Sequence, residues 1–173
     1  AGYGYTCRIK NKPVVFSLDL STPAGKIIFD DFKIKAGGQL RIYNYKNIQL
    51  AVKLNGISRR LNGEMVKALN LGIETGLCLG YYKPKWFLAV EAGYDKALVT
   101  QLKHTRLFKE NYPAVVDGWY ASTGGNIYYG LQTGFSCKQT NVYVKGGKIV
   151  AENFRNTPLV PFYFELGFNY RLK

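Results

Sequence analysis

Residues 161–173, which read PFYFELGFNYRLK, decide the fold more clearly than any other stretch of this sequence. Every second side chain in it is apolar, and the positions between them hold Tyr, Glu, Gly, Asn and Arg. Successive side chains of a β-strand point to opposite faces of the sheet. The stretch therefore predicts a long strand with one apolar face, formed by Phe162, Phe164, Leu166, Phe168, Tyr170 and Leu172.

The same alternation recurs along most of the chain and predicts about eight strands. Several are close to the 9 to 11 residues that a tilted strand needs to cross a bilayer. In the strand predicted over Asn141–Val150, Gly146 and Gly147 are expected to mark a bulge or a bend. The other predicted strands are Val14–Leu20, Phe32–Ile42, Ile48–Asn55, Leu69–Tyr82, Trp86–Asp95, Asn126–Lys138 and Asn141–Val150, and their apolar face includes Leu71, Ile73, Leu77, Leu88, Val90, Leu131 and Phe135.

The predicted connections alternate between short and long. Tight turns are expected at 45–47, 82–85 and 138–141, and longer polar or Gly-rich loops at 21–25, 56–64, 96–125 and 151–160. This alternation is typical of outer-membrane barrels, with the short turns in the periplasm and the long loops outside. The sequence thus predicts an all-β, antiparallel, up-and-down transmembrane barrel in one domain over 1–173, in which 1–12 could form a periplasmic or lumenal extension.

Composition excludes some classes of protein. No run reaches the roughly 18 to 20 apolar residues of a membrane-spanning helix, and 14 Tyr, 10 Phe and 19 Gly favour strands and turns. The net charge of +13 comes from dispersed basic residues without a nucleic-acid-binding motif, so no nucleic acid is expected as a partner. The lack of a charged-then-apolar leader before Ala1 is expected either of a mature secreted chain whose signal peptide has been removed, which is the favoured interpretation, or of a trimmed chain.

The last strand resembles the C-terminal signal by which the barrel-assembly machinery recognises bacterial outer-membrane barrel proteins. Glu165-Leu166-Gly167-Phe168-Asn169-Tyr170-Arg171-Leu172 follows that pattern of a polar residue, a Gly and two apolar or aromatic positions. It departs from the pattern by ending in Leu172 rather than Phe and by the additional Lys173. The resemblance implies an outer-membrane location with both termini in the periplasm, and the assembly machinery and outer-membrane lipids as partners. Aromatic rings at strand ends, Tyr81 and Trp86 among them, are expected at the membrane boundary.

The polar face of the predicted strands faces the lumen of such a barrel. An eight-stranded barrel is just wide enough for side chains to fill it. Charges of both signs are present, so a network of paired side chains is expected rather than a catalytic site. Inward glycines such as Gly72, Gly93 and Gly130 leave room for long side chains. The predicted network consists of Lys33, Arg41, Lys53, Glu74, Glu91, Gln132 and Glu165.

The cysteines do not indicate a metal site. Cys7, Cys78 and Cys137 lack the close spacing of zinc or redox motifs. One disulfide with a free thiol and three buried thiols remain equally compatible with the sequence. No metal and no cofactor is expected.

Two other sets of residues suggest binding or chemistry. His104, the one histidine, could act as a general base with Ser122 and Glu110, because some small outer-membrane barrels act on lipid A with Ser, His and a carboxylate. A histidine without a catalytic role is the favoured interpretation. Arg59, Arg60, Lys103 and Arg106, in the expected outer loops, could bind lipopolysaccharide phosphates.

The sequence therefore predicts a non-enzymatic outer-membrane barrel that serves as a structural or accessory subunit of an envelope complex. A lipid A-modifying enzyme and a narrow passage for small solutes are the alternatives. A soluble ligand-binding barrel gives the same periodicity, with the apolar face inside rather than outside.

Overall fold

The computed structural model describes residues 2–9, 12–22, 32–137, 140–153 and 161–170, with the backbone alone at 122, 123 and 169. Nine antiparallel strands form a single sheet in which the spatial order equals the sequence order. The one helix in the described part is α1 (Arg106–Asn111). The strands are β1 (Gly2–Ile9), β2 (Lys12–Ser21), β3 (Phe32–Tyr45), β4 (Ile48–Asn62), β5 (Val66–Tyr82), β6 (Trp86–His104), β7 (Gly118–Cys137), β8 (Thr140–Ala151) and β9 (Phe162–Tyr170).

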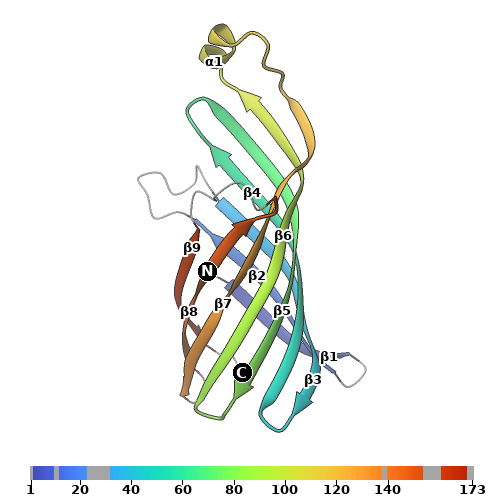
Figure 1. Ribbon diagram of the computed structural model, residues 1–173, viewed down its shortest axis with the longest axis vertical. Helices are drawn as coiled ribbons and strands as arrows, with labels where there is room; N and C mark the ends of the chain where they lie inside the picture. The colour runs from blue at the N-terminus through green and yellow to red at the C-terminus, as the bar shows by residue number, and fades with distance from the viewer. Residues whose placement is uncertain (1, 10–11, 23–31, 138–139, 154–160, 171–173) are drawn as a thin grey trace.

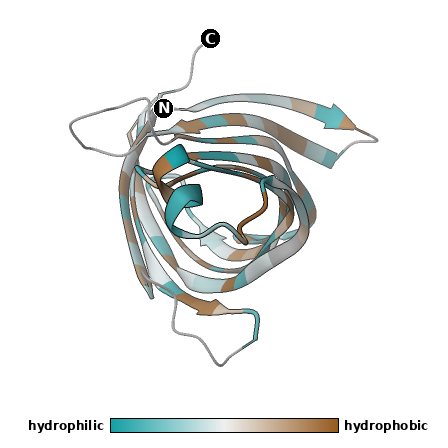
Figure 2. Ribbon diagram, turned by 90° about the horizontal axis from the view of Figure 1, so that it is seen from above, coloured by the Kyte–Doolittle hydropathy of each residue, from teal (hydrophilic) through white to brown (hydrophobic). Residues whose placement is uncertain are grey.

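The sheet curls into a half-barrel, which is seen from the side in Figure 1 and from above in Figure 2. The predicted all-β, antiparallel class is confirmed, and each predicted strand lies within or overlaps an observed one. The structure has one strand more than the eight predicted. This additional strand is β1, which lies in the segment 1–12 and pairs with β2 along its whole length. The predicted turns at 45–47 and 82–85 are present, and Lys46 at the first has a left-handed φ of 50°.

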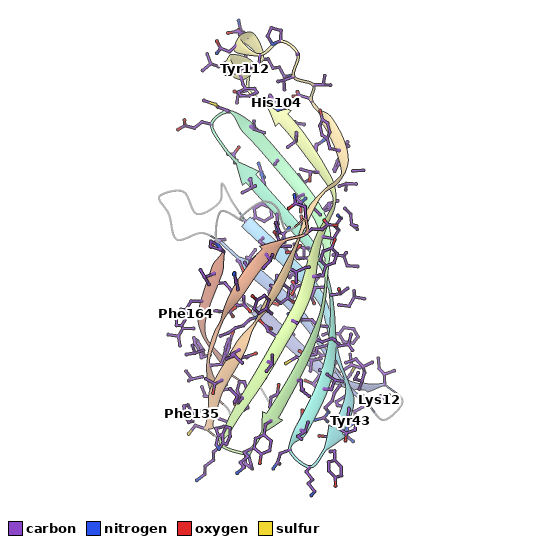
Figure 3. All side chains as sticks on the ribbon, in the orientation of Figure 1. Lys12, Tyr43, His104, Tyr112, Phe135 and Phe164 are labelled. Carbon is purple, nitrogen blue, oxygen red and sulfur yellow. The ribbon has the colours of Figure 1, made fainter. Side chains whose placement is uncertain are left out.

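The two faces of the sheet have opposite polarity. On β9 the side chains of Phe162, Phe164, Leu166 and Phe168 point outward and are 65% to 76% exposed. Phe135 and Phe164 project away from the wall in Figure 3. Among the described residues, the largest fully buried side chain is that of Glu74, whereas the buried apolar residues are few: Val14, Ala51, Ile57 and Ala89. The sheet therefore has a charged interior and an apolar exterior.

Two hairpins extend well beyond the rest of the half-barrel. The sequence predicts loops at 56–64 and 96–125, but β4 continues to Asn62, β6 continues to His104 and β7 begins at Gly118. These ends project upward in Figure 1, and α1 lies over the hollow of the half-barrel when viewed from above in Figure 2. The loop prediction is wrong there because polar residues occupy both faces of the extended strands and a register shift between Ala97 and Val99 interrupts the alternation.

Gly146 and Gly147 do not interrupt β8, contrary to the expected bulge. Both are paired in continuous register with β7 and with β9. A Cβ atom at Gly147 would lie 2.2 Å from the carbonyl oxygen of Tyr129, so the glycine permits close approach of two strands instead. The register shifts of the sheet occur at other places, between Arg41 and Tyr43, Leu71 and Gly72, and Ala97 and Val99.

Candidate functional site

The centre of the interior is organised around Glu74 on β5. Its carboxylate lies 2.6 Å from Lys35 Nζ on β3 and 2.9 Å from Lys53 Nζ on β4, and it accepts a hydrogen bond of 2.7 Å from the hydroxyl of Tyr128 on β7. The Glu74 side chain is 2% exposed, whereas those of Lys35 and Lys53 are 30% and 25% exposed. One buried carboxylate thus joins four strands, and its burial is balanced by two cations and a hydroxyl.

Two further carboxylates extend this network toward the C-terminal strands. Glu91 on β6 lies 2.6 Å from Lys145 Nζ on β8 and accepts a hydrogen bond of 2.8 Å from the hydroxyl of Tyr163 on β9. Glu165 on β9 accepts a hydrogen bond of 2.7 Å from the hydroxyl of Tyr143 on β8. The rings of Tyr128 and Tyr163 meet edge to face, with centroids 6.5 Å apart, and connect the Glu74 and Glu91 groups.

A third group lies nearer the extended hairpins. Arg59 on β4 forms an ion pair with Asp95 on β6 and donates a hydrogen bond of 3.2 Å to the side chain of Asn70 on β5. Asn70 in turn donates to the hydroxyl of Thr100 at 2.7 Å. Polar contacts therefore occur in separate groups along the interior, from β9 to the base of the extension.

A cavity of about 540 Å³ lies in the lumen between this network and the short turns. Its lining is mainly polar and includes the charged side chains of Lys53, Glu91 and Lys145. Residues near the turns, Tyr82, Pro84 and Phe87, complete its lower wall, where the rings of Tyr82 and Phe87 stack with centroids 5.4 Å apart.

The predicted lumen residues all lie on strands, but they do not form one cluster. Lys53 and Glu74 contact each other, whereas Glu91 and Glu165 have separate partners. Arg41 donates to Gln49 at 3.2 Å, Gln132 lines the cavity, and Lys33 lies on β3 two residues before Lys35. The prediction did not include the partners Tyr128, Tyr143, Tyr163, Lys145 and Asp95. The sequence did contain a signal for these partners, because each occupies one of the alternating positions that form the polar face of its strand.

Inward glycines face inward aromatic rings. A Cβ atom at Gly93 would lie 2.4 Å from the Tyr128 ring, and one at Gly167 would lie 2.4 Å from the ring of Tyr143. An aromatic ring that covers a glycine on a neighbouring strand is a known device of curved sheets. The glycines and tyrosines of the interior thus form matched pairs.

Substitution of Gly167 by Ala is expected to destabilise the protein by about 1–3 kcal/mol, because the new methyl group overlaps the Tyr143 ring. In a Tyr143→Ala background the same substitution should cost little, which a double-mutant cycle of urea unfolding in detergent would measure. Gly56→Ala is the matched control, since its Cβ would meet only the carbonyl oxygen of Ala36 at 3.7 Å. Equal costs in both backgrounds would contradict the pairing.

The candidate catalytic residues are not brought together by the backbone. His104 Nδ1 lies 2.9 Å from Asp117 Oδ1, while Glu110 pairs with Arg106 on the exposed face of α1. The backbone of Ser122 follows Ala121, which pairs with Val99, about 17 Å along β6 from His104 at 3.3 Å per residue. Its side chain lies outside the described part of the structure. The sequence interpretation missed Asp117 as the carboxylate partner of His104.

Asp117 anchors α1 to the extension. It accepts hydrogen bonds from Lys109 Nζ at 2.6 Å and from the backbone N–H of His104 at 2.9 Å. These contacts, together with the His104 ring, hold the pKa of the Asp117 carboxyl well below its usual range. The His104 ring also stacks on Phe108, with centroids 5.3 Å apart, so the histidine contributes to packing.

The predicted lipopolysaccharide-binding residues are divided between two faces. Arg59 points inward to Asp95 and is not available to an outside ligand. Arg60 and Lys103 are exposed, and Lys103 lies directly opposite Lys67 across β5 and β6. Arg106 begins α1 and is 92% exposed beside Glu110. The expectation that all four lie in outer loops is wrong for Arg59, Arg60 and Lys103, because the hairpin strands extend through them.

The thiols of Cys7, Cys78 and Cys137 are free, with Cys7 and Cys78 half-buried and Cys137 exposed, so neither the disulfide nor the three buried thiols is found. In the part of the chain that the structure describes, no group of His, Cys, Asp and Glu side chains could hold a metal ion. Within the same residues, no helix has the length and apolar character to cross a membrane.

The fold and the site define an all-β half-barrel sheet with a paired, charged interior and an apolar exterior. Compared with models of protein families, with curated proteins and with solved structures, the chain has no match.

Proposed function

We propose that this protein is a non-enzymatic integral barrel of a bacterial outer membrane, where it acts as a structural or accessory subunit of an envelope complex. The observation that carries the proposal is the polarity of the sheet. Large apolar side chains such as Phe164 and Phe168 are 76% and 74% exposed, while Glu74 is 2% exposed. In water this arrangement exposes apolar surface and places charges in the interior. A bilayer stabilises the same arrangement, because lipid surrounds the apolar side chains.

The same polarity argues against a soluble ligand-binding barrel. Such a barrel carries its apolar side chains on the inside, where the ligand binds. Here the cavity is lined by Lys53, Glu91 and Lys145, and the outward face of β9 is formed by Phe and Leu. This distinction depends on the direction of curvature of the sheet, which periodicity alone does not provide.

The geometry supports a structural role over the two alternatives. The Glu74 group spans β3, β4, β5 and β7 and fills the interior at its own level, next to the cavity on the side of the short turns, which supports a plugged interior over an open passage. The separation of His104 from the Ser122 backbone along the hairpin, and the pairing of Glu110 with Arg106, give no support to a Ser-His-carboxylate enzyme acting on lipid A. The partners of this proposal are outer-membrane lipids and lipopolysaccharide, with Arg60 and Lys103 as exposed phosphate-binding cations.

The proposed orientation places the short turns and the end of β9 in the periplasm. The expected periplasmic position of both termini does not fit nine antiparallel strands, because Gly2, at the start of β1, lies at the opposite end of the sheet from the end of β9. The assembly signal then lies on β9, where Gly167 and Tyr170 belong to a continuous strand and Glu165 points inward. Leu172, its last position, lies outside the described residues. This strand would then be the one that the barrel-assembly machinery recognises.

Membrane insertion is tested by refolding the purified chain with and without detergent. We expect the folded protein to require detergent, to float with phosphatidylcholine vesicles in a density gradient, and to migrate differently before and after boiling on a detergent gel. A chain that remains folded and monomeric in buffer alone would refute the proposal.

A further inference from the structure

The short-turn end of the sheet carries a cluster of aromatic rings and lysines, here called the turn belt: Tyr45, Lys46, Tyr81, Lys83 and Trp86. Lys46 Nζ lies 5.3 Å from the centroid of the Tyr45 ring. Lys83 Nζ lies 5.7 Å from the centroids of both the Tyr81 and the Trp86 rings. Those two rings are themselves 5.7 Å apart. Each ammonium group is thus held beside an aromatic face by cation–π attraction.

The two turns of the belt are joined directly. The backbone N–H of Tyr82 donates a hydrogen bond of 2.8 Å to the carbonyl oxygen of Asn47, and the Asn47 side chain donates to the Tyr81 hydroxyl at 3.3 Å. Ile48 and Tyr81 are register partners. The cations of the β3–β4 turn and of the β5–β6 turn are therefore carried on one connected surface.

No acidic residue balances this surface in the sequence around it. The stretches 41–52 (RIYNYKNIQLAV) and 77–90 (LCLGYYKPKWFLAV) contain Lys46, Lys83 and Lys85 but neither Asp nor Glu. All three lysines are exposed. An aromatic face accepts an ammonium group without neutralising it, so the belt keeps a positive charge and free N–H donors.

The belt lies at the edge of the apolar wall. Leu79 and Leu88, the next outward residues on β5 and β6, are 50% and 47% exposed. Tyr45 is 56% exposed on the same outward face, and Tyr43, also at this end in Figure 3, is 52% exposed. Aromatic rings next to an apolar wall occupy the headgroup level of a bilayer.

We infer that the turn belt binds the phosphate of an anionic phospholipid headgroup, with Lys46 and Lys83 as its cationic ligands. The aromatic rings restrict the two lysines, and the apolar wall next to them contacts the acyl chains. This inference rests on the proposed membrane insertion and adds a preference for one class of lipid on the side of the short turns.

The test compares phosphatidylglycerol with phosphatidylcholine. The folded protein in detergent is titrated with each lipid, and the lipid that stays bound is counted by native mass spectrometry. We expect preferential retention of phosphatidylglycerol, and a loss of that preference of about fivefold for each lysine in Lys46→Gln and Lys83→Gln, from roughly 1 kcal/mol per basic residue near an anionic surface. Lys67→Gln, at the opposite end of the sheet, is the matched control and should retain the preference.

Several outcomes distinguish the possible failures. Equal retention of the two lipids by a chain that inserts into phosphatidylcholine vesicles would overturn the inference and leave the proposed function standing. A chain that does not insert into phosphatidylcholine vesicles would refute the proposed function itself. Full displacement of phosphatidylglycerol by equimolar inorganic phosphate would overturn the inference that the ligand is a lipid. An unchanged preference for phosphatidylglycerol in the folded Lys46→Gln/Lys83→Gln variant would overturn the inference that the turn belt binds it.

Discussion

Substitution of Phe164 by Arg is expected to destabilise the protein in a lipid bilayer by about 2–4 kcal/mol, the cost of a cation on the lipid face near the midplane of a barrel. Phe164 is the third residue of β9, opposite the middle of β8, points outward and is 76% exposed. It pairs with Gly146 and covers it at van der Waals distance. The free energy of unfolding in urea, measured on protein refolded into phosphatidylcholine vesicles, gives the effect.

The sign of this effect separates the two environments. In water, replacing an exposed Phe by Arg changes stability little and improves solubility. Leu107→Arg is the matched control, because Leu107 is 68% exposed but lies on α1, beyond the wall of the sheet. If Phe164→Arg were as well tolerated as Leu107→Arg in vesicles, β9 would not face lipid.

Substitution of Glu74 by Gln is expected to destabilise the fold by about 2–3 kcal/mol. Gln has nearly the same size and can still accept the hydrogen bond from Tyr128, but the negative charge between Lys35 and Lys53 is lost. Breaking a buried ion pair typically costs about 3–5 kcal/mol. We expect less because the two lysine side chains are 30% and 25% exposed, so water reaches them. Urea unfolding in detergent, followed by tryptophan fluorescence, measures the change.

Glu152→Gln provides the comparison for Glu74→Gln. Glu152 also pairs with a lysine, Lys96 at 2.5 Å, but its side chain is 41% exposed. Solvent screens an exposed pair, so the loss of stability should be much smaller than for Glu74→Gln. Equal effects of the two substitutions would show that the network around Glu74 adds no more stability than an exposed pair does.

The strands and their faces could be predicted because both depend on a local period of two. Phe162 to Phe168 and Leu69 to Leu79 alternate without interruption, and each set lies on the outward face as expected. The direction in which the sheet curls does not depend on local sequence. The same alternation was therefore also compatible with a soluble barrel. Arg59 and Arg60 illustrate the limit. As loop residues they seemed equivalent, but in β4 one points to Asp95 and the other to solvent.

The partners within the interior could not be predicted from parity. Tyr128 and Glu74 are 54 residues apart in the sequence, and Tyr163 and Glu91 are 72 apart. Their contacts depend on the register of strands that are not adjacent and on the space left by glycines between them. The alternation of apolar and polar positions identified Glu74, Glu91 and Glu165 as inward residues. The tyrosine that donates a hydrogen bond to each carboxylate is known only from the assembled sheet.

The sequence-ordered sheet also has a consequence for how the chain folds. Each of the eight pairings from β1 to β9 joins strands that are neighbours in the sequence, so each can form as a hairpin with a small loss of loop entropy. With nine strands in this order, β1 and β9 run in the same direction. A seam between them would be parallel, whereas a seam between β2 and β9 would be antiparallel and would require β1 to leave its place. Either seam would close a loop of almost the whole chain, so we expect any joining of the two edges to be slower than the formation of the hairpins.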